Sequence, residues 1–361
     1  MVGIRSLIFR PFTQMVGRTG KRDVWQSLVI TRKCRASRLV SPPCAKVYGA
    51  KRTCPKARLR TGARWRTQHI PRAARRARDA NERGPEAMYP HIHLHVLASG
   101  SKGNAAVVEG PKGSILIDCG ISRRELLRRA GDLGVDMGRV SALLLTHEHS
   151  DHVAGIPVFA KHFGGTLIAT AGTVSGSPRL AGLSFDLVGH SDSFDVAGMH
   201  VQCFPTSHDV GDPMGFRFSV TGDDDQAEDA LGWCTDSGLL TAEALGLLRD
   251  VRILGIESNH DVDLLAHGPY PAFLRARVGS DTGHLSNAQC AEALPLLVGP
   301  DTETVVALHL SEKNNRPGVC VRTLAAAVGA EVLADNDAEA RSPDGTLTVR
   351  AASQTTPLSV W

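Results

Sequence analysis

The stretch Thr146-His147-Glu148-His149-Ser150-Asp151-His152 brings three imidazoles and a carboxylate into seven residues, directly behind the apolar run of residues 140–145. That run has the branched composition of a buried strand, so the polar cluster is expected on a loop at a strand end. In an extended chain His147 and His149 point the same way, which lets two Nε2 atoms converge on one ion. The aspartate and the last histidine of the stretch offer a second pair of ligands. One loop therefore predicts two adjacent metal ions.

The residues around this cluster predict how it is held and what it does. Residues 151–163 have a helix-like pattern, which places Asp151 near a helix N-terminus and fixes its carboxylate. Glu148 is expected to face solvent. A redox site on such a loop favours a carboxylate at the second position, where this chain has His149. The loop therefore favours hydrolysis.

Charge divides the chain into two unequal parts. Residues 1–88 hold 22 Lys or Arg against four Asp or Glu, whereas residues 89–361 hold 19 against 33, a balance of −14. The first part contains 17 Arg and shows no sustained helical or strand period, so it is not expected to bury a core. We interpret residues 1–88 as a basic, disordered extension and residues 89–361 as an α/β catalytic domain.

Three interpretations of the Arg-rich extension stay open. A basic arm could follow phosphates, and an Arg-rich, acid-poor segment also suits organelle targeting. The interpretation that we prefer is that the natural start lies at Met88, immediately before the first strand pattern, and that the preceding residues are not part of the native protein. Peptides from residues 1–87 in the native protein would exclude this last interpretation.

The eight cysteines do not predict a disulfide framework. Cys34, Cys44 and Cys54 are spaced too widely for a metal clip, and the others lie mostly in apolar segments, as expected for buried thiols in a reducing compartment. A metal role for Cys119 and Cys234, which lie beside aspartates, is a weaker alternative. No apolar stretch approaches the roughly 20 residues that a membrane-spanning helix needs, so a cytoplasmic protein without a membrane partner is expected.

Strand and helix patterns alternate along the catalytic part. Ile92, Leu94 and Val96 alternate with three histidines, His91, His93 and His95, which are expected on the exposed face of a strand. Further strands are predicted at residues 105–109, 114–119, 166–168, 199–204, 216–220, 231–235, 251–256 and 305–308. Helices are predicted at residues 125–130, 242–248, 288–298 and 319–328. Two β-rich halves closed by helices follow.

Motifs along the chain resemble a known superfamily. The H-x-H-x-D-H signature at residues 147–152 is similar to that of metallo-β-lactamases, and further segments narrow the resemblance to the WalJ/YycJ branch of nuclease-like hydrolases. These segments, in order, are Ala98-Ser99-Gly100-Ser101-Lys102-Gly103-Asn104-Ala105, Ser207-His208-Asp209, Thr235-Asp236-Ser237-Gly238, Glu257-Ser258-Asn259-His260-Asp261, Gly283-His284-Leu285-Ser286-Asn287 and His309-Leu310-Ser311. The resemblance covers about residues 91–329 and implies an αββα sandwich.

The remaining metal ligands are expected at other strand ends, in the order that the superfamily has them. We expect His208 to complete the first ion with His147 and His149, and His309 to complete the second with Asp151 and His152. Asp236 is expected to bridge two divalent ions, Zn²⁺ or Mn²⁺. By the same resemblance, the buried Asp118 hydrogen-bonds a ligating histidine.

The resemblance also implies catalytic roles. A hydroxide that bridges the ions is the expected nucleophile, and Asp151 is expected to aim it. By similarity to RNA-processing relatives, His284 is expected to be the general acid, oriented by Glu257. His260 is expected to support the site rather than contact substrate.

The implied activity is phosphodiester cleavage in nucleic acid, most of all 5′→3′ exonuclease action on DNA. Alternatives are an RNA-processing endoribonuclease, a thioester, glyoxalase-like or lactamase hydrolase, and a metal-stabilised binding module without turnover. The net charge of −14 for residues 89–361 is unexpected for a protein that binds a polyanion such as DNA. We expect a basic patch at the mouth of the site, with Asn314 and Asn315 near phosphate or base edges; its members are Arg275, Arg277, Lys313 and Arg316.

Overall fold

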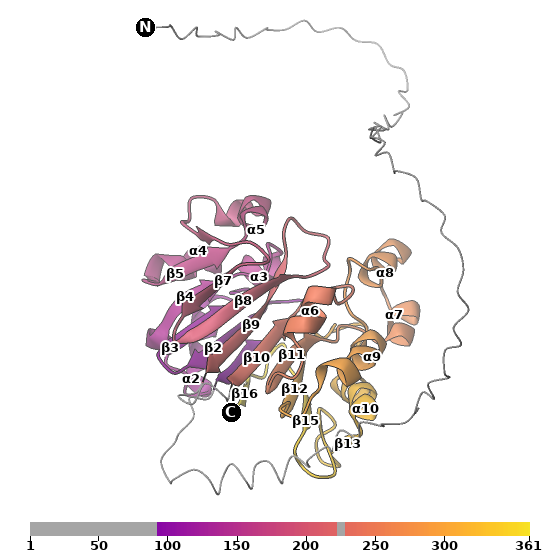
Figure 1. The fold of residues 1–361 in the computed structure, drawn as a ribbon. Coiled ribbons are helices and arrows are strands. Elements are labelled where there is room, and N and C mark those ends of the chain that lie inside the picture. Colours follow the sequence, from indigo (N-terminus) through magenta and orange to yellow (C-terminus); the bar gives the residue numbers. More distant parts are fainter. Residues whose placement is uncertain (1–91, 222–227) are drawn as a thin grey trace, which may run out of the picture. The chain divides into compact units, whose positions relative to one another are not determined.

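The structure is a computed structural model that describes residues 92–221 and 228–361 (Figure 1). The predictions for residues 1–88 and for His91 lie outside these described residues. The described part contains two β-sheets with helices outside them. None of its helices is long and apolar enough to cross a membrane.

The first sheet has seven strands. Its order is β16 (Leu358–Val360), β1 (His93–Ala98), β2 (Ala105–Gly110), β3 (Gly113–Ile117), β4 (Val140–Leu144), β5 (Thr166–Ala169) and β6 (Asp186–Leu187). Strands β1, β2 and β3 pair antiparallel, as the sequence predicts, and β3 to β6 run parallel. The carboxyl ends of β3 and β4 therefore meet at one edge of the sheet, where the metal-ligand motif begins.

The second sheet has nine strands. Its order is β13 (Glu331–Val332), β14 (Glu339–Arg341), β15 (Thr348–Ala351), β12 (Thr304–Leu308), β11 (Ile253–Glu257), β10 (Glu228–Cys234), β9 (Met214–Thr221), β8 (Met199–Pro205) and β7 (Ser193–Val196). Strands β10, β11, β12 and β15 run parallel. The polar segments that follow β10, β11 and β12 consequently gather at one edge of this sheet.

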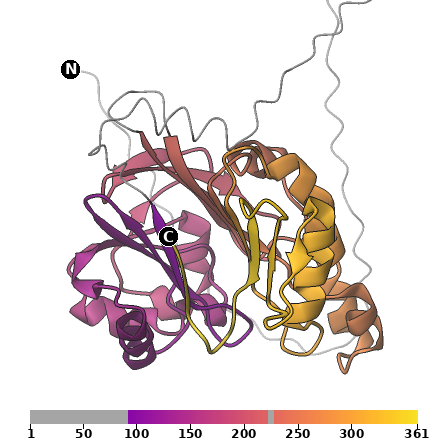
Figure 2. The same cartoon turned by 90° about the horizontal axis from the view of Figure 1, so that it is seen from below.

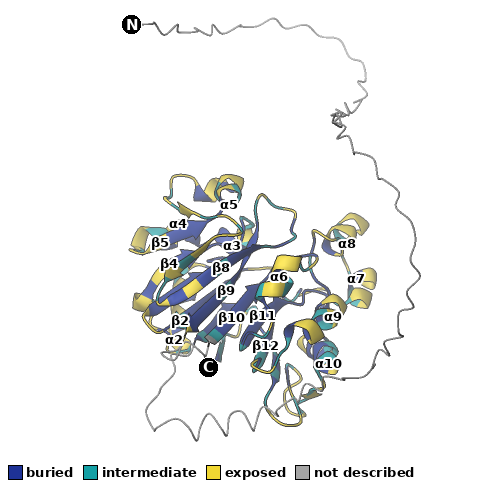
Figure 3. Cartoon of the chain, in the orientation of Figure 1, coloured by how far each residue is buried: buried dark blue, intermediate teal, exposed yellow. Residues whose placement is uncertain are grey.

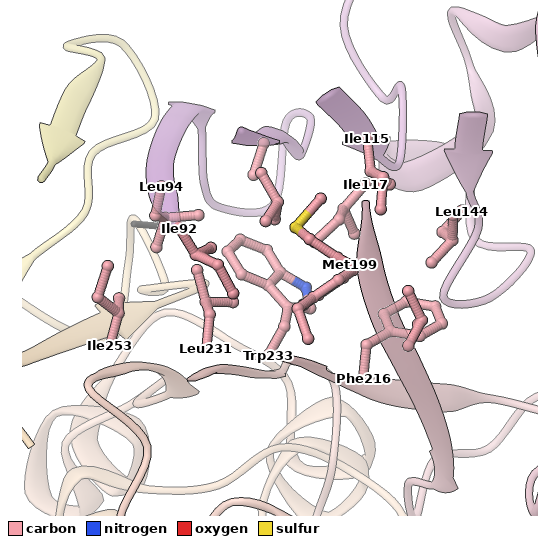
Figure 4. Packing of buried hydrophobic residues seen from close by; sticks show 14 of the residues in the cluster. Ile92, Leu94, Ile115, Ile117, Leu144, Met199, Phe216, Leu231, Trp233 and Ile253 are labelled. Atoms are coloured by element: carbon pink, nitrogen blue, oxygen red, sulfur yellow. The ribbon is translucent and has the colours of Figure 1, made fainter. Parts of the chain in front are cut away.

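Apolar side chains of the two sheets pack against each other in the middle of the molecule. Figure 4 shows residues of the first sheet, among them Leu94, Ile115 and Leu144, facing Phe216 and Trp233 of the second. All five are buried. This shared core makes the two sheets a sandwich.

Helices cover the outer faces of both sheets. Those packed on the first sheet are α2 (Arg123–Asp132), α3 (Ser150–Val153), α4 (Ile156–Phe159) and α5 (Ala171–Gly176), with the short turns η1 (Met137–Arg139), η2 (Ala160–His162) and η3 (Pro178–Leu180). On the second sheet are α6 (Ala242–Leu247), α9 (Asn287–Leu297) and α10 (Pro317–Val328). Figure 2 shows α9 and α10 outside the second sheet, and Figure 3 shows that the helices expose their outward sides. The predicted αββα architecture is confirmed.

Local sequence signals set the ends of the longest helices. Helix α9 begins with a reciprocal cap, in which the Ser286 hydroxyl accepts from the Gln289 N–H and the Gln289 side chain accepts from the Ser286 N–H. Helix α10 has Pro317 at its first position and ends at Gly329, whose φ of +68° suits glycine. These two helices bury their apolar sides beneath the strands that carry the site.

Three predictions about the described part need correction. The pattern of residues 151–163 forms α3, α4 and η2 rather than one helix, because other segments take the hydrogen bonds that would continue α3: the Gly155 N–H donates to the Cys119 carbonyl at 2.8 Å, and the Asp151 carbonyl accepts from the Asn104 N–H at 2.7 Å. His95 is buried, not exposed, because β1 is covered on both faces; its Nδ1 lies 2.8 Å from Ser359 Oγ. Strands β13 to β16 were not predicted. The five described cysteines are buried free thiols, as expected.

Candidate metal centre

The histidine-rich loop follows β4, as the sequence predicts, and Asp118 fixes its start. Asp118 comes directly after β3 and has a positive φ of 57°. Its carboxylate accepts from the Thr146 N–H at 2.8 Å and from the Thr146 hydroxyl at 2.9 Å. It also pairs with His152 Nδ1 at 2.8 Å. The hydrogen bond expected between Asp118 and a histidine of the loop is thus present, and it directs Nε2 of His152 towards the centre, where Asn104 Nδ2 lies 3.0 Å from it.

His147, His149 and His208 come together as one group of possible ligands, with their nitrogen atoms within 4.8 Å of one another. His208 follows β8, and its Nδ1 pairs with the Gly283 carbonyl at 2.9 Å, so Nε2 faces inward. This Nε2 lies 3.2 Å from Nδ1 of His149, not from the Nε2 that we expected to converge. The three residues predicted for the first ion are therefore adjacent.

Asp151, His152 and His309 form a second group. One carboxylate oxygen of Asp151 lies 3.5 Å from His152 Nε2 and 3.3 Å from His309 Nε2. Asn104 steadies Asp151, because its backbone N–H donates to the Asp151 carbonyl at 2.7 Å. His309, directly behind β12, has a φ of 56°. These are the residues predicted for the second ion.

Asp236 lies between the two groups. It follows β10, has a φ of 55° and is buried. One of its oxygens is 3.9 Å from His147 Nε2 and 3.9 Å from His208 Nε2, and the other is 3.3 Å from His152 Nε2. A carboxylate in this position can contact ions in both groups, as expected of a bridging ligand.

The donor set fits divalent metal. Imidazole nitrogens and carboxylate oxygens are the ligands that Zn²⁺ and Mn²⁺ take in hydrolytic sites. Nε2 of His147 is buried and has no hydrogen-bond partner, although buried polar atoms almost always have one. Burial and the neighbouring His152 and His208 hold the pKa of His147 well below its usual value. A neutral imidazole with a buried, unused lone pair is suited to bind an ion.

In the second group, neighbouring carboxylates raise the pKa values of the histidines. Burial alone would lower the pKa of His152, but Asp236, Asp118 and Asp151 together raise it well above the usual value. Burial opposes the same effect at His309, where Asp236, Asp151 and Glu257 raise the pKa to about 10. Negative charge is therefore concentrated on this side of the centre, where cations would be stabilised.

A second histidine–carboxylate pair lies beside the metal groups. Glu257, at the end of β11, is fully buried, and its Oε1 is 2.8 Å from His284 Nδ1 and 3.0 Å from His309 Nδ1. The Ser237 N–H donates to its other oxygen at 2.8 Å. His284 is 18% exposed and lines the pocket above the centre. The predicted orientation of His284 by Glu257 is present, but Glu257 also holds His309.

A pocket of about 290 Å³ opens over these residues. Asp151, Asp236, His284 and His309 all line it. Both metal groups and the Glu257–His284 pair are thus reached from a single cavity.

Comparison with known proteins identifies the family. Residues 114–310 match the model of the β-lactamase superfamily domain. The chain belongs to this superfamily. It is 32% identical to the exodeoxyribonuclease YycJ of Bacillus anthracis, over 62% of this chain and 84% of that protein. It is 33% identical to the exodeoxyribonuclease WalJ of Streptococcus pneumoniae serotype 2 strain D39, over 61% and 82%.

The fold agrees with this assignment. The crystal structure of the metallo-β-lactamase fold protein YhfI from Bacillus subtilis is similar to the chain with a TM-score of 0.52, at 13% identity, over 74% of this chain and 99% of that one. The protein is a metal-dependent hydrolase of the WalJ/YycJ type, with the metallo-β-lactamase fold that its motifs resemble.

Several predictions around the centre of this hydrolase are wrong. Glu148 does not face solvent: it is half-buried, and its carboxylate accepts from the Gly211 N–H at 2.8 Å, which ties the histidine loop to the segment behind His208. Asn314 and Asn315 are buried, and Asn315 donates to the Ser258 and Asn259 carbonyls at 3.0 Å, so they hold loops rather than contact substrate.

The predicted basic patch is reduced to one residue at the pocket. Arg277 lines the cavity, whereas Arg275, Lys313 and Arg316 are not among its lining residues in the described chain. Arg277 also pairs with Asp209, with nitrogen–oxygen distances of 2.5 and 2.9 Å. Of the four predicted basic residues, Arg277 alone lines the pocket among the described residues.

Four further residues lie in or near the site of this metallo-β-lactamase fold: His260, Cys119, Cys234 and Ser99. His260 is buried, and burial lowers its pKa to about 4, so it contributes no charge at neutral pH. Among the described residues, neither Cys119 nor Cys234 belongs to a group that could hold a metal ion. Ser99, which the sequence did not single out, accepts from the His309 N–H at 2.8 Å. Its place in the first glycine-rich motif was the only signal.

Proposed function

We propose that the protein is a phosphodiesterase that depends on two divalent metal ions, and that it acts as a 5′→3′ exonuclease on DNA. The observation that carries the proposal is the contact of 2.8 Å between Glu257 and His284, because His284 lines a pocket that members of both ligand groups also line. Cleavage of a phosphodiester releases an alkoxide that needs a proton, and a positioned histidine supplies one. The names of the two bacterial relatives support DNA as the substrate.

Seven residues would hold the ions. His147, His149 and His208 would bind the first, Asp151, His152 and His309 the second, and Asp236 both. When bound, Zn²⁺ or Mn²⁺ would supply a nucleophile by lowering the pKa of water and would neutralise charge on the phosphoryl oxygens.

The chain's own groups would perform the other steps. Asp151, whose backbone Asn104 fixes, can accept a hydrogen bond from the attacking water and aim it. His284 would carry the proton for the leaving oxygen on Nε2, because Nδ1 is occupied by Glu257. Arg277 at the pocket wall would bind a phosphate oxygen, because about half of its side chain is exposed although it pairs with Asp209.

One assay tests the proposal against its alternatives. The full chain, loaded with Mn²⁺ or Zn²⁺, is offered 5′-phosphorylated DNA, structured RNA, a thioester and a cephalosporin. We expect release of nucleotides from the 5′ end of DNA and none from the chelator-treated enzyme. Thioester or cephalosporin turnover without nucleic-acid cleavage would contradict the proposal, and internal cleavage of RNA alone would favour an endoribonuclease.

A further inference from the structure

A helical hairpin forms one wall of the active-site pocket. It consists of α7 (Val262–His267) and α8 (Ala272–Val278), inserted between β11 and α9, and Figure 1 shows it projecting beyond the second sheet. Leu274, Arg277 and Val278 line the pocket from one side of α8, at helical spacing. The segment that joins the two helices adds the ring of Tyr270 to the same wall.

The rest of the pocket is polar. Asp151, Asp236, His284 and His309 form its reactive part, and Ser101 and Ser311 also line it. On the side of α8 the cavity is therefore bordered by Tyr270, Leu274 and Val278, with Arg277 among them, and the rest of its lining is polar or charged. A nucleotide has the same division, with an apolar base face at one end and a phosphate at the other.

The cavity limits how much substrate can enter. Its volume of about 290 Å³ lies at the lower end of the range for small-molecule sites, roughly 300–1,000 Å³. That volume is of the order of a single nucleotide, in a pocket that is open to solvent. An unpaired terminal nucleotide would therefore fit beside His284 more readily than a paired one.

We propose that Tyr270 stacks on the base of an unpaired terminal nucleotide and so selects single-stranded or frayed DNA ends. This inference rests on the proposed exonuclease function. Tyr270 is half-buried at the wall of the pocket, and a tyrosine side chain has only two χ angles, so it loses little freedom on binding. Every base has a π-face, so stacking on one aromatic ring favours the presence of a base and not its identity.

The first test uses two substrates and the full-length wild-type enzyme with Mn²⁺. One is a 5′-phosphorylated single strand, and the other is the same strand with an abasic terminal nucleotide. Stacking predicts that kcat/KM for the abasic end is about tenfold lower, the size expected for one stacked base. Equal kcat/KM values would overturn the inference, whereas failure to cleave either strand would instead contradict the proposed function.

The second test uses variants on both substrates. Tyr270→Leu keeps apolar volume without the aromatic ring, so it should lose about tenfold on the normal strand and nothing further on the abasic one. Tyr270→Phe should retain the preference for a base. Equal loss on both substrates would overturn the inference, because it would mean that Tyr270 only packs the wall.

Phe273→Ala is the matched control. Phe273 lies on the same hairpin and is 75% exposed, but it does not belong to the described residues that line the pocket. This variant should keep the wild-type preference for a base; loss of that preference would move the stacking site away from Tyr270 and overturn the inference.

The requirement for an unpaired end has its own measurement. A strand with a 5′ single-stranded end should be degraded at least about tenfold faster than a blunt duplex closed by G·C pairs, because opening a pair costs a few kcal/mol. Equal rates on the two ends would contradict selection of unpaired nucleotides.

Discussion

Two histidine–carboxylate pairs lie in this site, and their surroundings give them different properties. In the first, His152 is completely buried, with Nδ1 on Asp118 and Nε2 facing Asp151 and Asp236. In the second, His284 is 18% exposed, with Nδ1 on Glu257 at the same distance of 2.8 Å. The pair alone therefore does not determine the role. The surroundings of each ring differ: Nε2 of His152 faces two carboxylates, whereas His284 lines the open pocket.

The largest loss of activity should come from removing a carboxylate that faces His152 of the first pair. Asp151→Ala removes a carboxylate from the second ligand group and the group that would aim water. We expect a loss of kcat/KM on the order of 10⁴-fold, since the charge stabilisation given by an ion is worth several kcal/mol. Elemental analysis should show less than two ions per chain. Asp132→Ala, an exposed aspartate on α2, is the control, and full activity of Asp151→Ala would refute the ligand assignment.

Replacing His284, the more exposed of the two histidines, should affect only proton transfer. His284→Gln is expected to lower kcat on DNA by about 10²–10⁴-fold, the usual worth of a general acid, while two ions stay bound. On a p-nitrophenyl phosphodiester, whose leaving group needs no proton, the loss should be much smaller. Equal losses on both substrates would mean that His284 is not the acid.

How far the sequence predicted this site depends on whether its residues are close along the chain. The loop of residues 146–152 could be interpreted directly. The polar residues behind β8, β10 and β12 lie at strand ends, but only their resemblance to the order of ligands in the superfamily assigned them to the site. Alternation gave the long strands because each has apolar residues in the shared core. Helices α2, α6, α9 and α10 were also predicted, whereas the short helices α5 and α7 were not, although each begins with a side-chain cap.

What could not be predicted depends on distant partners. Strand β16 is three residues long and pairs with β1 more than 250 positions earlier, so no local period marks it. The same pairing helps to bury His95, which local alternation placed outside. Glu148 acquired its partner only because the segment behind β8 folds against its loop. Backbone twists at Asp118, Asp236 and His309 were likewise invisible in the sequence.

A milder substitution, at Asp118, tests how the two histidine–carboxylate pairs differ. Asp118→Asn keeps the shape and tolerates the positive φ, but it removes the charge that fixes His152. We expect metal affinity to fall by about 10–100-fold, as is usual for partners of ligating histidines. Glu257→Gln is the variant for comparison. Glu257 contacts His284 as well as His309, so its loss should lower kcat even at saturating metal. Unchanged metal affinity in Asp118→Asn, measured by competition with a chelating dye, would contradict its role.

Removing metal should loosen the whole domain. The possible ligands come from strand ends in both sheets, so bound ions would link the two halves. Free metal at 100 times Kd adds about 2.7 kcal/mol of stability, which corresponds to a Tm increase on the order of 5–10 °C. Calorimetry before and after chelation measures it, and Asp151→Ala should show a smaller difference. A Tm that does not respond to metal would speak against the centre.

The smallest effect concerns a third pair that is outside the pocket. His95 lies 3.4 Å from Glu109, and burial lowers its pKa despite that carboxylate. A histidine with a lowered pKa contributes stability above its unfolded value of 6.5, and the contribution is lost as the pH falls below it. Between pH 7 and pH 5 the Tm of the wild type should fall by about 2 °C more than that of His95→Gln. Equal slopes would contradict this.

The spread of the ligand groups along the chain affects how the protein is made. The first histidine of the site is residue 147 and the last is residue 309, and the parallel strands that place the later ones pair in the second sheet. During synthesis, which proceeds from the N-terminus at about 5–20 residues per second, the motif that begins the site leaves the ribosome many seconds before its last member. The proposed set of ligands is complete only after that delay, so we expect the metal to be loaded late in the maturation of each molecule.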